Sequence, residues 1–201
     1  SDMWKPYLNV IAEQIPQAVH VLDRFHIMRN MNVAIDEVRR QEVTQLRRDG
    51  YEPALTKSRW CLLKRPENLT DNQATRLAEL LQYNLKSVRA HLLREEFQRF
   101  WEYATPAWAG KFLDSWCTQA MRSRLAPMKK VAKSLRRHRH LILNWFLALG
   151  GISSGVVEGF NGKAKLTTRK AYGFRTPQGI EFALFHVMGN LPKPKCTHRF
   201  C

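Results

Sequence analysis

The sequence predicts an α/β fold at its start, joined to a large all-helical block. A short β-branched segment, "QAVHVLD" (17–23), lies between two helical patterns and reads as a buried strand. From about residue 54 to 150 the segments instead have a helical period, with no convincing strand. The 201 residues, 44% of them hydrophobic, are enough for a buried core.

The first fifty residues predict helix, strand and helix in that order. In "WKPYLNVIAEQI" (4–15) the apolar residues recur at helical spacing, and Pro6 is tolerated in the first turn. The strand over 17–23 ends at Asp23. A long helix over 24–48 follows and ends at the "DGYEP" turn (49–53).

The middle of the chain predicts a bundle of helices rich in aromatic residues. Trp and Phe recur mainly at helical spacing, which favours a packed core over stacking on nucleic-acid bases. The residues concerned are Trp60, Phe97, Phe100, Trp101, Trp108, Phe112, Trp116, Trp145 and Phe146.

After the helical block, "GGISSG" (150–155) interrupts the pattern. Ser153 and Ser154 are candidate N-caps of a helix over about 155–171. The turn "YGFRTPQG" (172–179) leads into a last helix over 180–190, and residues 191–201 form a tail.

The charge points to a polyanionic partner. The chain has 33 Lys and Arg against 17 Asp and Glu, a formal net charge of +16. Such a surface attracts nucleic acid, because each phosphate contact releases counterions. A membrane surface is the competing polyanion, but no apolar run of transmembrane length and no signal peptide are present. Four scattered cysteines fit a reducing cytoplasm.

One acidic residue, Glu158, lies at the head of the basic stretch "GVVEGFNGKAKLTTRKAYGFR" (155–175). On a helix, Glu158, Asn161, Lys165 and Arg169 share one stripe, beside an apolar stripe that includes Phe160 and can pack inward. Glu158 is either a favourable acid in the first helical turn or a ligand of a divalent metal. In the second case the neighbouring residues bind the nucleic-acid backbone: Asn161, Lys163, Lys165, Arg169, Lys170, Tyr172 and Arg175.

A metal at Glu158 needs further carboxylates, and Asp2 and Asp23 are the candidates. Asp2 precedes a helix and is alternatively only its cap. Asp23 ends the expected strand, where open α/β sheets place functional side chains. The motif "DRFH" (23–26) puts His26 three residues after Asp23, close enough for a hydrogen bond or a shared ion, although His26 is alternatively a structural histidine.

The order and wording of these segments resemble the catalytic region of bacterial DDE transposases of the IS-L-three family of insertion sequences. The similarity runs from "SDMWKPYLNVIAEQIPQAVHVLDRFHIMRN", through the helical block, to "SSGVVEGFNGKAKLTTRKAYGFRTPQGIEFALFHVMGNLP". It implies an RNase H-like, retroviral-integrase-like core that is incomplete at its N-terminus and carries a large helical insertion. The expected division is core over 1–50, insertion over 51–150, core helices over 151–190 and tail over 191–201.

The resemblance also implies roles for the acidic residues. Asp2 matches the second catalytic Asp and Glu158 the catalytic Glu, while Asp23 and His26 match the Asp-x-x-His signature in supporting positions. Asp2 and Glu158 are then ligands of two Mg²⁺ or Mn²⁺ ions. The first catalytic Asp has no counterpart, and the chain has no initiator Met, so we expect a domain that continues upstream and a fragment that is inactive alone.

The implied function is metal-dependent DNA strand cleavage and strand transfer during transposition of a mobile element. The implied partner is double-stranded DNA, both transposon ends and target, bound by a homo-oligomer in a synaptic complex of the bacterial cytoplasm and nucleoid. Two alternatives stay open: an inactive remnant that only binds DNA, and an RNA-binding helical protein.

Overall fold

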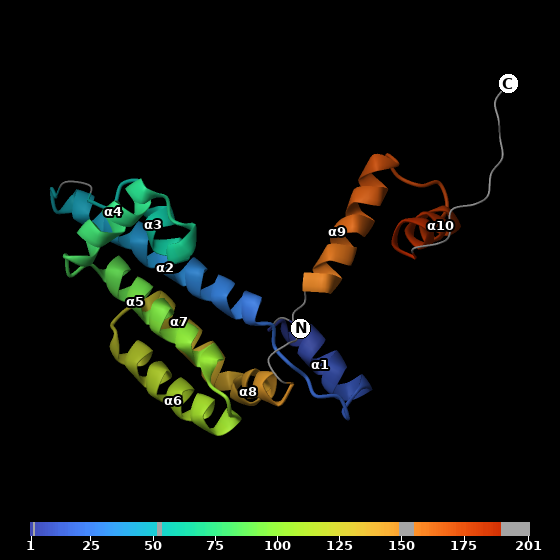
Figure 1. Ribbon diagram of the computed structural model, residues 1–201, viewed down its shortest axis with the longest axis horizontal. Coiled ribbons are helices and arrows are strands. Elements are labelled where there is room, and N and C mark those ends of the chain that lie inside the picture. Colours follow the sequence, from blue (N-terminus) through green and yellow to red (C-terminus); the bar gives the residue numbers. More distant parts are fainter. Residues whose placement is uncertain (2, 52–53, 149–154, 190–201) are drawn as a thin grey trace. The chain divides into compact units, whose positions relative to one another are not determined.

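The computed structural model describes residues 1, 3–51, 54–148 and 155–189, and this part of the chain is mostly helical (Figure 1). The α-helices are α1 (Lys5–Gln14), α2 (Arg24–Arg48), α3 (Arg59–Leu63), α4 (Asp71–Leu81), α5 (Lys86–Gln98), α6 (Pro106–Arg122), α7 (Ala126–Arg137), α8 (Arg139–Leu147), α9 (Gly155–Lys170) and α10 (Pro177–Met188). Two short 3₁₀ helices, Pro66–Asn68 and Arg99–Glu102, complete the described elements.

The expected α/β, RNase H-like sheet is wrong for the described residues, because none of them lies in a β-strand. The segment expected as a strand begins with a turn, and residues 19–23 have no regular secondary structure. Among the described residues, its backbone is hydrogen-bonded to a distant part of the backbone at Ser1, whose N-terminal nitrogen donates to the Val21 carbonyl at 2.9 Å and whose carbonyl accepts from the Asp23 N–H at 2.8 Å. Two such bonds do not make a ladder, and strands need a ladder of partners to be stable.

The chain divides into two compact units, Ser1–Ile152 and Ser153–Cys201. The first unit therefore contains both the segment expected as core (1–50) and the segment expected as insertion (51–150). The expected domain boundaries themselves stay a prediction.

Helix α2 is the helix around which the first unit packs, since it contacts α3, α5 and α7. Helices α5 and α7 lie alongside it, α6 packs against α7, and α3 packs on α2 while also contacting α4 (Figure 1). The bounds of α2 match the prediction: Asp23 caps its start, and Gly50, with φ of +75°, follows its end. The buried face of α2 is built from Ile27, Met31, Ala34, Ile35 and Val38.

Glu42 on α2 caps the N-terminus of α5, although α5 begins 44 residues later. Its two carboxylate oxygens accept from the backbone N–H groups of Lys86 at 2.7 Å and Ser87 at 2.8 Å, and it also accepts from the Ser87 hydroxyl. Those N–H groups have no partner within α5, and the positive end of the helix dipole favours a negative charge there. A buried carboxylate thus joins the two helices.

Arg94 on α5 joins the same helices further along. It is 2% exposed, and its guanidinium donates to the carbonyls of Leu63 at 2.7 Å and Lys64 at 3.2 Å and to Asn32 Oδ1 on α2 at 3.0 Å. It is also ion-paired with Glu95. Burying a charge is favourable only when its donors are satisfied in this way.

The expected aromatic core is confirmed for the buried rings of the helical block. Phe97 packs against Phe100 with ring centroids 5.2 Å apart and against Trp116 at 4.8 Å, and the indole N–H of Trp116 donates to the Leu93 carbonyl at 2.8 Å. Trp60 and Trp108 depart from the expectation, because they are 52% and 61% exposed. Each is covered by a cation instead, Trp60 by Arg59 and Trp108 by Lys111.

The basic run "RRHRH" (136–140) is divided between two helices. The backbone at His138 leaves helical geometry, with φ of −103° and ψ of 19°, so α7 ends at Arg137 and α8 begins at Arg139. Arg139 then forms a bidentate pair with Asp114 of α6, with both distances 3.0 Å. The break therefore directs one cation of the run to a protein partner.

Two further properties concern the environment of the chain. Within the described residues, no helix has both the length and the apolar character needed to cross a membrane. Cys61 and Cys117 are both buried free thiols, and burial raises the pKa of Cys117 to about 11. A thiol held protonated in this way is a poor nucleophile.

The second unit contains α9 and α10, which pack against each other. The sequence placed Phe160 on an inward-packing apolar stripe, but Phe160 is 46% exposed. The last helix begins earlier than expected, at Pro177, where the Thr176 hydroxyl accepts from the Gly179 N–H at 3.2 Å. The candidate N-caps Ser153 and Ser154 and the tail over 191–201 lie outside the described residues.

The Glu42 cap predicts that Glu42→Gln lowers the free energy of unfolding by about 1–3 kcal/mol, because one buried N–H loses its acceptor and the helix end loses its counter-charge. Urea unfolding followed by circular dichroism measures the change. Glu37→Gln is the matched control on the same helix, since Glu37 accepts only a side-chain bond from Gln41 at 3.2 Å. Equal stability of the two variants would show that the cap contributes nothing.

His91 predicts a pH dependence of stability. Its Nδ1–H donates to the Leu62 carbonyl at 2.9 Å, and burial, as the main cause, lowers its pKa below 6.5. The unfolded chain therefore binds a proton more readily than the folded chain, and stability falls as the pH drops below about 6.5. Gln at this position keeps a donor and does not titrate. We expect His91→Gln to lose less stability than the unaltered chain between pH 7.5 and 5.5 in urea titrations; parallel losses would contradict this.

Candidate functional site

Asp23 is placed by the start of α2. Its carboxylate Oδ1 accepts from the Phe25 N–H at 2.9 Å, and its backbone carbonyl accepts from Ile27 at 3.3 Å. Asp23 is only 7% exposed, because the preceding Leu22 is anchored in the core. A carboxylate at this position caps the helix and is stabilised by the helix dipole. From the sequence we expected Asp23 to end a strand, but the structure shows that it is the N-cap of α2.

His26 lies on the first turn of α2 and faces the same carboxylate. Its Nε2 is 3.9 Å from Asp23 Oδ2, and its ring lies edge-on to Phe25 with centroids 5.6 Å apart. The structure therefore brings Asp23 and His26 together, as their spacing predicts. At 3.9 Å the pair has an electrostatic contact rather than a good hydrogen bond.

The segment before Asp23 is tied to two distant parts of the first unit. Asn144 of α8 donates from Nδ2 to the His20 carbonyl at 2.9 Å. Ser1 bonds to the same segment through its backbone, and its hydroxyl lies 2.6 Å from His20 Nε2. Sequence reasoning missed these anchors, because neither Asn144 nor Ser1 was a candidate site residue.

Helix α9 carries the predicted DNA-binding side chains on its exposed surface. Asn161, Lys163, Lys165, Arg169 and Lys170 are all exposed. Thr167 and Thr168 donate back to the Lys163 and Ala164 carbonyls, so these hydroxyls support the helix itself. The described residues of α9 from Gly159 to Lys170 include four cations and no acid.

The end of α9 exposes the remaining two predicted residues. The Gly173 N–H donates to the Thr168 carbonyl at 3.3 Å, the bond that closes a Schellman-type helix end. Tyr172 has φ of +52° and is fully exposed. Arg175 is exposed as well. This turn therefore directs an aromatic ring and a cation to solvent.

The distance between the two expected metal ligands, Asp2 and Glu158, cannot be read from the described residues. Asp2 and the side chain of Glu158 lie outside the described residues, although the backbone of Glu158 lies in the first turn of α9. Among the residues that are described, no three His, Cys, Asp or Glu side chains gather into a group that could hold a metal ion. The pairing of Asp2 with Glu158 stays a prediction.

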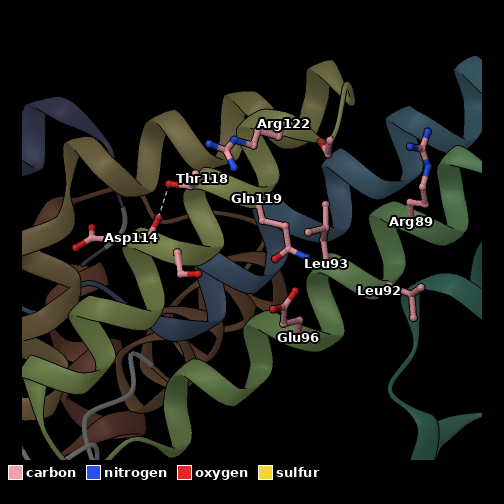
Figure 2. Close-up of a pocket in the computed structure, with 10 residues that line it drawn as sticks. Arg89, Leu92, Leu93, Glu96, Asp114, Thr118, Gln119 and Arg122 are labelled. Atoms are coloured by element: carbon pink, nitrogen blue, oxygen red, sulfur yellow. Dashed lines mark hydrogen bonds between the residues drawn. The ribbon is translucent and has the colours of Figure 1, made fainter.

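A hollow of about 850 Å³ lies between α5 and α6 and was not predicted (Figure 2). Arg89 and Glu96 line it from α5, and Asp114 and Arg122 line it from α6. Its two cations are balanced by two acids, so it lacks the positive potential that a nucleic-acid site needs. Apart from its leucines, most of its lining is polar, and such residues on a helix surface give no distinctive signal in sequence.

Comparison with known proteins identifies the family. The family model of DDE transposases of the ISL3 (IS-L-three) type, described as "Transposase", matches residues 1–184. No solved structure matches the chain.

Two curated relatives agree. The transposase for insertion sequence element IS1001 of Bordetella parapertussis is 38% identical over 176 residues, which cover 87% of this chain and 43% of the relative. The transposase for insertion sequence element IS1557 of Mycobacterium tuberculosis is 32% identical over 209 residues, covering 92% of this chain and 46% of the relative. The chain thus spans less than half the length of these relatives, and it belongs to the IS-L-three family of transposases.

Proposed function

We propose that this chain supplies metal-binding and DNA-binding residues for the strand cleavage and strand transfer of a DNA transposase. The observation that carries the proposal is the family match over residues 1–184, which includes Asp2, Asp23, His26 and Glu158. The exposed cations of α9, which follow Glu158 on the same helix, support it.

In this proposal Asp2 and Glu158 hold two divalent cations, Mg²⁺ or Mn²⁺. Carboxylate oxygens are the donors that such hard ions prefer, so the residue types fit. Asp23 adds a carboxylate at a helix N-terminus, and Ser1, which precedes Asp2 in the chain, is bonded to the Asp23 backbone. Bound metal ions would neutralise phosphate charge and favour deprotonation of the attacking hydroxyl or water.

The side chains of α9 are proposed to bind the phosphate backbone next to the scissile bond. Lys163, Lys165, Arg169, Lys170 and Arg175 are cations without an acid between them, and Asn161 is an uncharged donor. The exposed ring of Tyr172 would pack against a sugar or base. Positioning of the DNA and neutralisation of its charge are the main contributions that a protein makes to phosphoryl transfer.

Asp23 and His26 are proposed as positioning residues. The Asp23 carboxylate caps α2 through Oδ1 and faces His26 through Oδ2. It therefore fixes the first turn of α2 and the imidazole together. The partner is proposed to be double-stranded DNA, at transposon ends and target, bound by a homo-oligomer in the synaptic complex.

The decisive test of the metal assignment is Glu158→Gln in a protein extended by the coding sequence upstream of Ser1. We expect Mg²⁺-dependent cleavage of DNA that carries the ends of the element to fall by at least about 1,000-fold, because a ligand is lost. Affinity for the same DNA should persist. Glu181→Gln, an exposed acid of α10, is the control. Undiminished cleavage by the Glu158 variant would refute the assignment, and cleavage by neither protein would favour a remnant that only binds DNA.

A second variant separates the capping role of Asp23 from the role of its charge. Asparagine caps helices as well as aspartate, so Asp23→Asn should keep the melting temperature. We expect its cleavage rate in the extended protein to fall by roughly 10- to 100-fold, the usual effect of losing a supporting charge near a metal. Asp49→Asn, at the other end of α2, is the control. Unchanged cleavage by Asp23→Asn would reduce Asp23 to a helix cap.

A further inference from the structure

A second cationic surface lies in the first unit, in a groove of about 580 Å³ between α2 and α3. The groove contains four arginines and one acid. It is lined by Arg29, Asn32, Val33, Asp36, Arg39 and Arg40 of α2 and by Arg59 and Leu63 of α3. In contrast to the hollow between α5 and α6, its charges do not balance.

Asp36 organises the arginines of this groove. Its carboxylate lies 2.8 Å from Arg39 Nη2, 3.5 Å from Arg59 Nε and 3.6 Å from Arg40 Nε. The Asp36 side chain is only 15% exposed, whereas those of Arg40 and Arg59 are 64% and 53% exposed. One largely buried carboxylate therefore holds three guanidinium groups together. The Arg39 side chain is only 17% exposed, so Arg40 and Arg59 are the two that face solvent.

Arg29 adds a fourth cation to the groove. It is exposed, and no carboxylate of the described residues lies within 4.0 Å of it. Arg29 and Arg40 are eleven residues apart, so they lie on one side of α2, three helical turns from each other. The groove thus has a net charge of about +3, counted from four arginines and one aspartate.

The cationic surface continues toward the start of α2. A smaller hollow shares Asn32 and Leu63 with the groove and is lined also by Arg24 and Arg65. Burial lowers the pKa of Arg24, and the positive charge of Arg65 lowers it further. The acids Glu102 and Glu67 offset part of this charge, since Glu102 raises the pKa of Arg24 and Glu67 lies 3.7 Å from Arg65. An anion bound between the two arginines would still be stabilised.

We propose that the groove between α2 and α3 binds the phosphate backbone of duplex DNA. This inference rests on the proposed function, because it assumes that the chain acts on DNA. Guanidinium groups bind phosphate oxygens in a bidentate manner, and here a carboxylate already orients them. From Arg24 to Arg40, α2 rises about 24 Å, which corresponds to about seven base pairs of duplex. The groove would therefore contact DNA alongside the α2 terminus that carries Asp23 and His26.

The test compares two double variants on the same helix. Arg29→Gln/Arg40→Gln removes two groove cations, and Arg47→Gln/Arg48→Gln removes two exposed cations at the other end of α2. Both lower the net charge equally. Fluorescence anisotropy with the full 201-residue chain, a labelled 30-base-pair duplex, EDTA and 0.1 M salt measures binding without any cleavage. Thermal melting confirms that each variant is folded.

We expect the groove variant to bind the duplex roughly 10- to 60-fold more weakly, because each phosphate contact contributes about eightfold at this salt concentration. Its log-affinity should depend less steeply on log salt, by about two units of slope. The control variant should lose less than about threefold. Arg40→Gln alone, at an exposed side chain that does not support the core, should lose about fivefold.

Equal losses in the two double variants would overturn the proposal, because binding would then follow net charge and not the groove. Tighter binding of single-stranded RNA than of duplex DNA at matched salt would also overturn it. Since EDTA abolishes metal-dependent chemistry, these results do not depend on Glu158. The groove can therefore fail while the cleavage assignment stands, and the reverse also holds.

Discussion

The first unit depends on the contact between α2 and α5, which two buried ionic groups hold in register. Glu42 of α2 caps the start of α5, and Arg94 of α5 reaches back to Asn32 and to the carbonyls after α3. Each group is satisfied only when both helices are in place. Removing one partner leaves a buried charge or N–H groups without partners, which costs more than an ordinary hydrogen bond provides. The aromatic core of Phe97, Phe100 and Trp116 then packs in the space that this pairing defines.

The candidate functional side chains of this unit take their positions from the same helix. The start of α2 fixes Asp23 and His26, and its side next to α3 presents the groove arginines. Several of the few acids are used within the protein: Glu42 caps a helix, Asp114 pairs with Arg139, and Asp36 gathers arginines. Most of the described cations are exposed, although Arg94 is buried, so the excess of 16 positive charges becomes a surface field that can attract DNA.

The helices were predicted correctly from the sequence, whereas the predicted sheet is wrong for the described residues. The period of the apolar residues gave α2 its observed bounds and the aromatic block its buried rings, because one helix face must be apolar to pack. The β-branched segment before Asp23 was assigned as a strand, but β-propensity reflects packing against neighbouring strands, and the described chain offers it only Ser1. The nearness of Asp23 and His26 followed from their spacing. The groove arginines were not predicted, because Arg59 comes from another helix and no motif in the sequence marks Asp36 as its partner.

By itself the sequence determined the excess of positive charge and the family: charge is a sum over residues, and the order of motifs around Asp2, Asp23 and Glu158 is a linear property. Tertiary structure alone decided that Asp23 is a helix cap, that Trp60 and Trp108 lie outside the core, and that one carboxylate on α2 gathers arginines from two helices. Those outcomes depend on which distant groups satisfy each buried polar atom. That choice is made by the packing of whole helices, which no local pattern specifies.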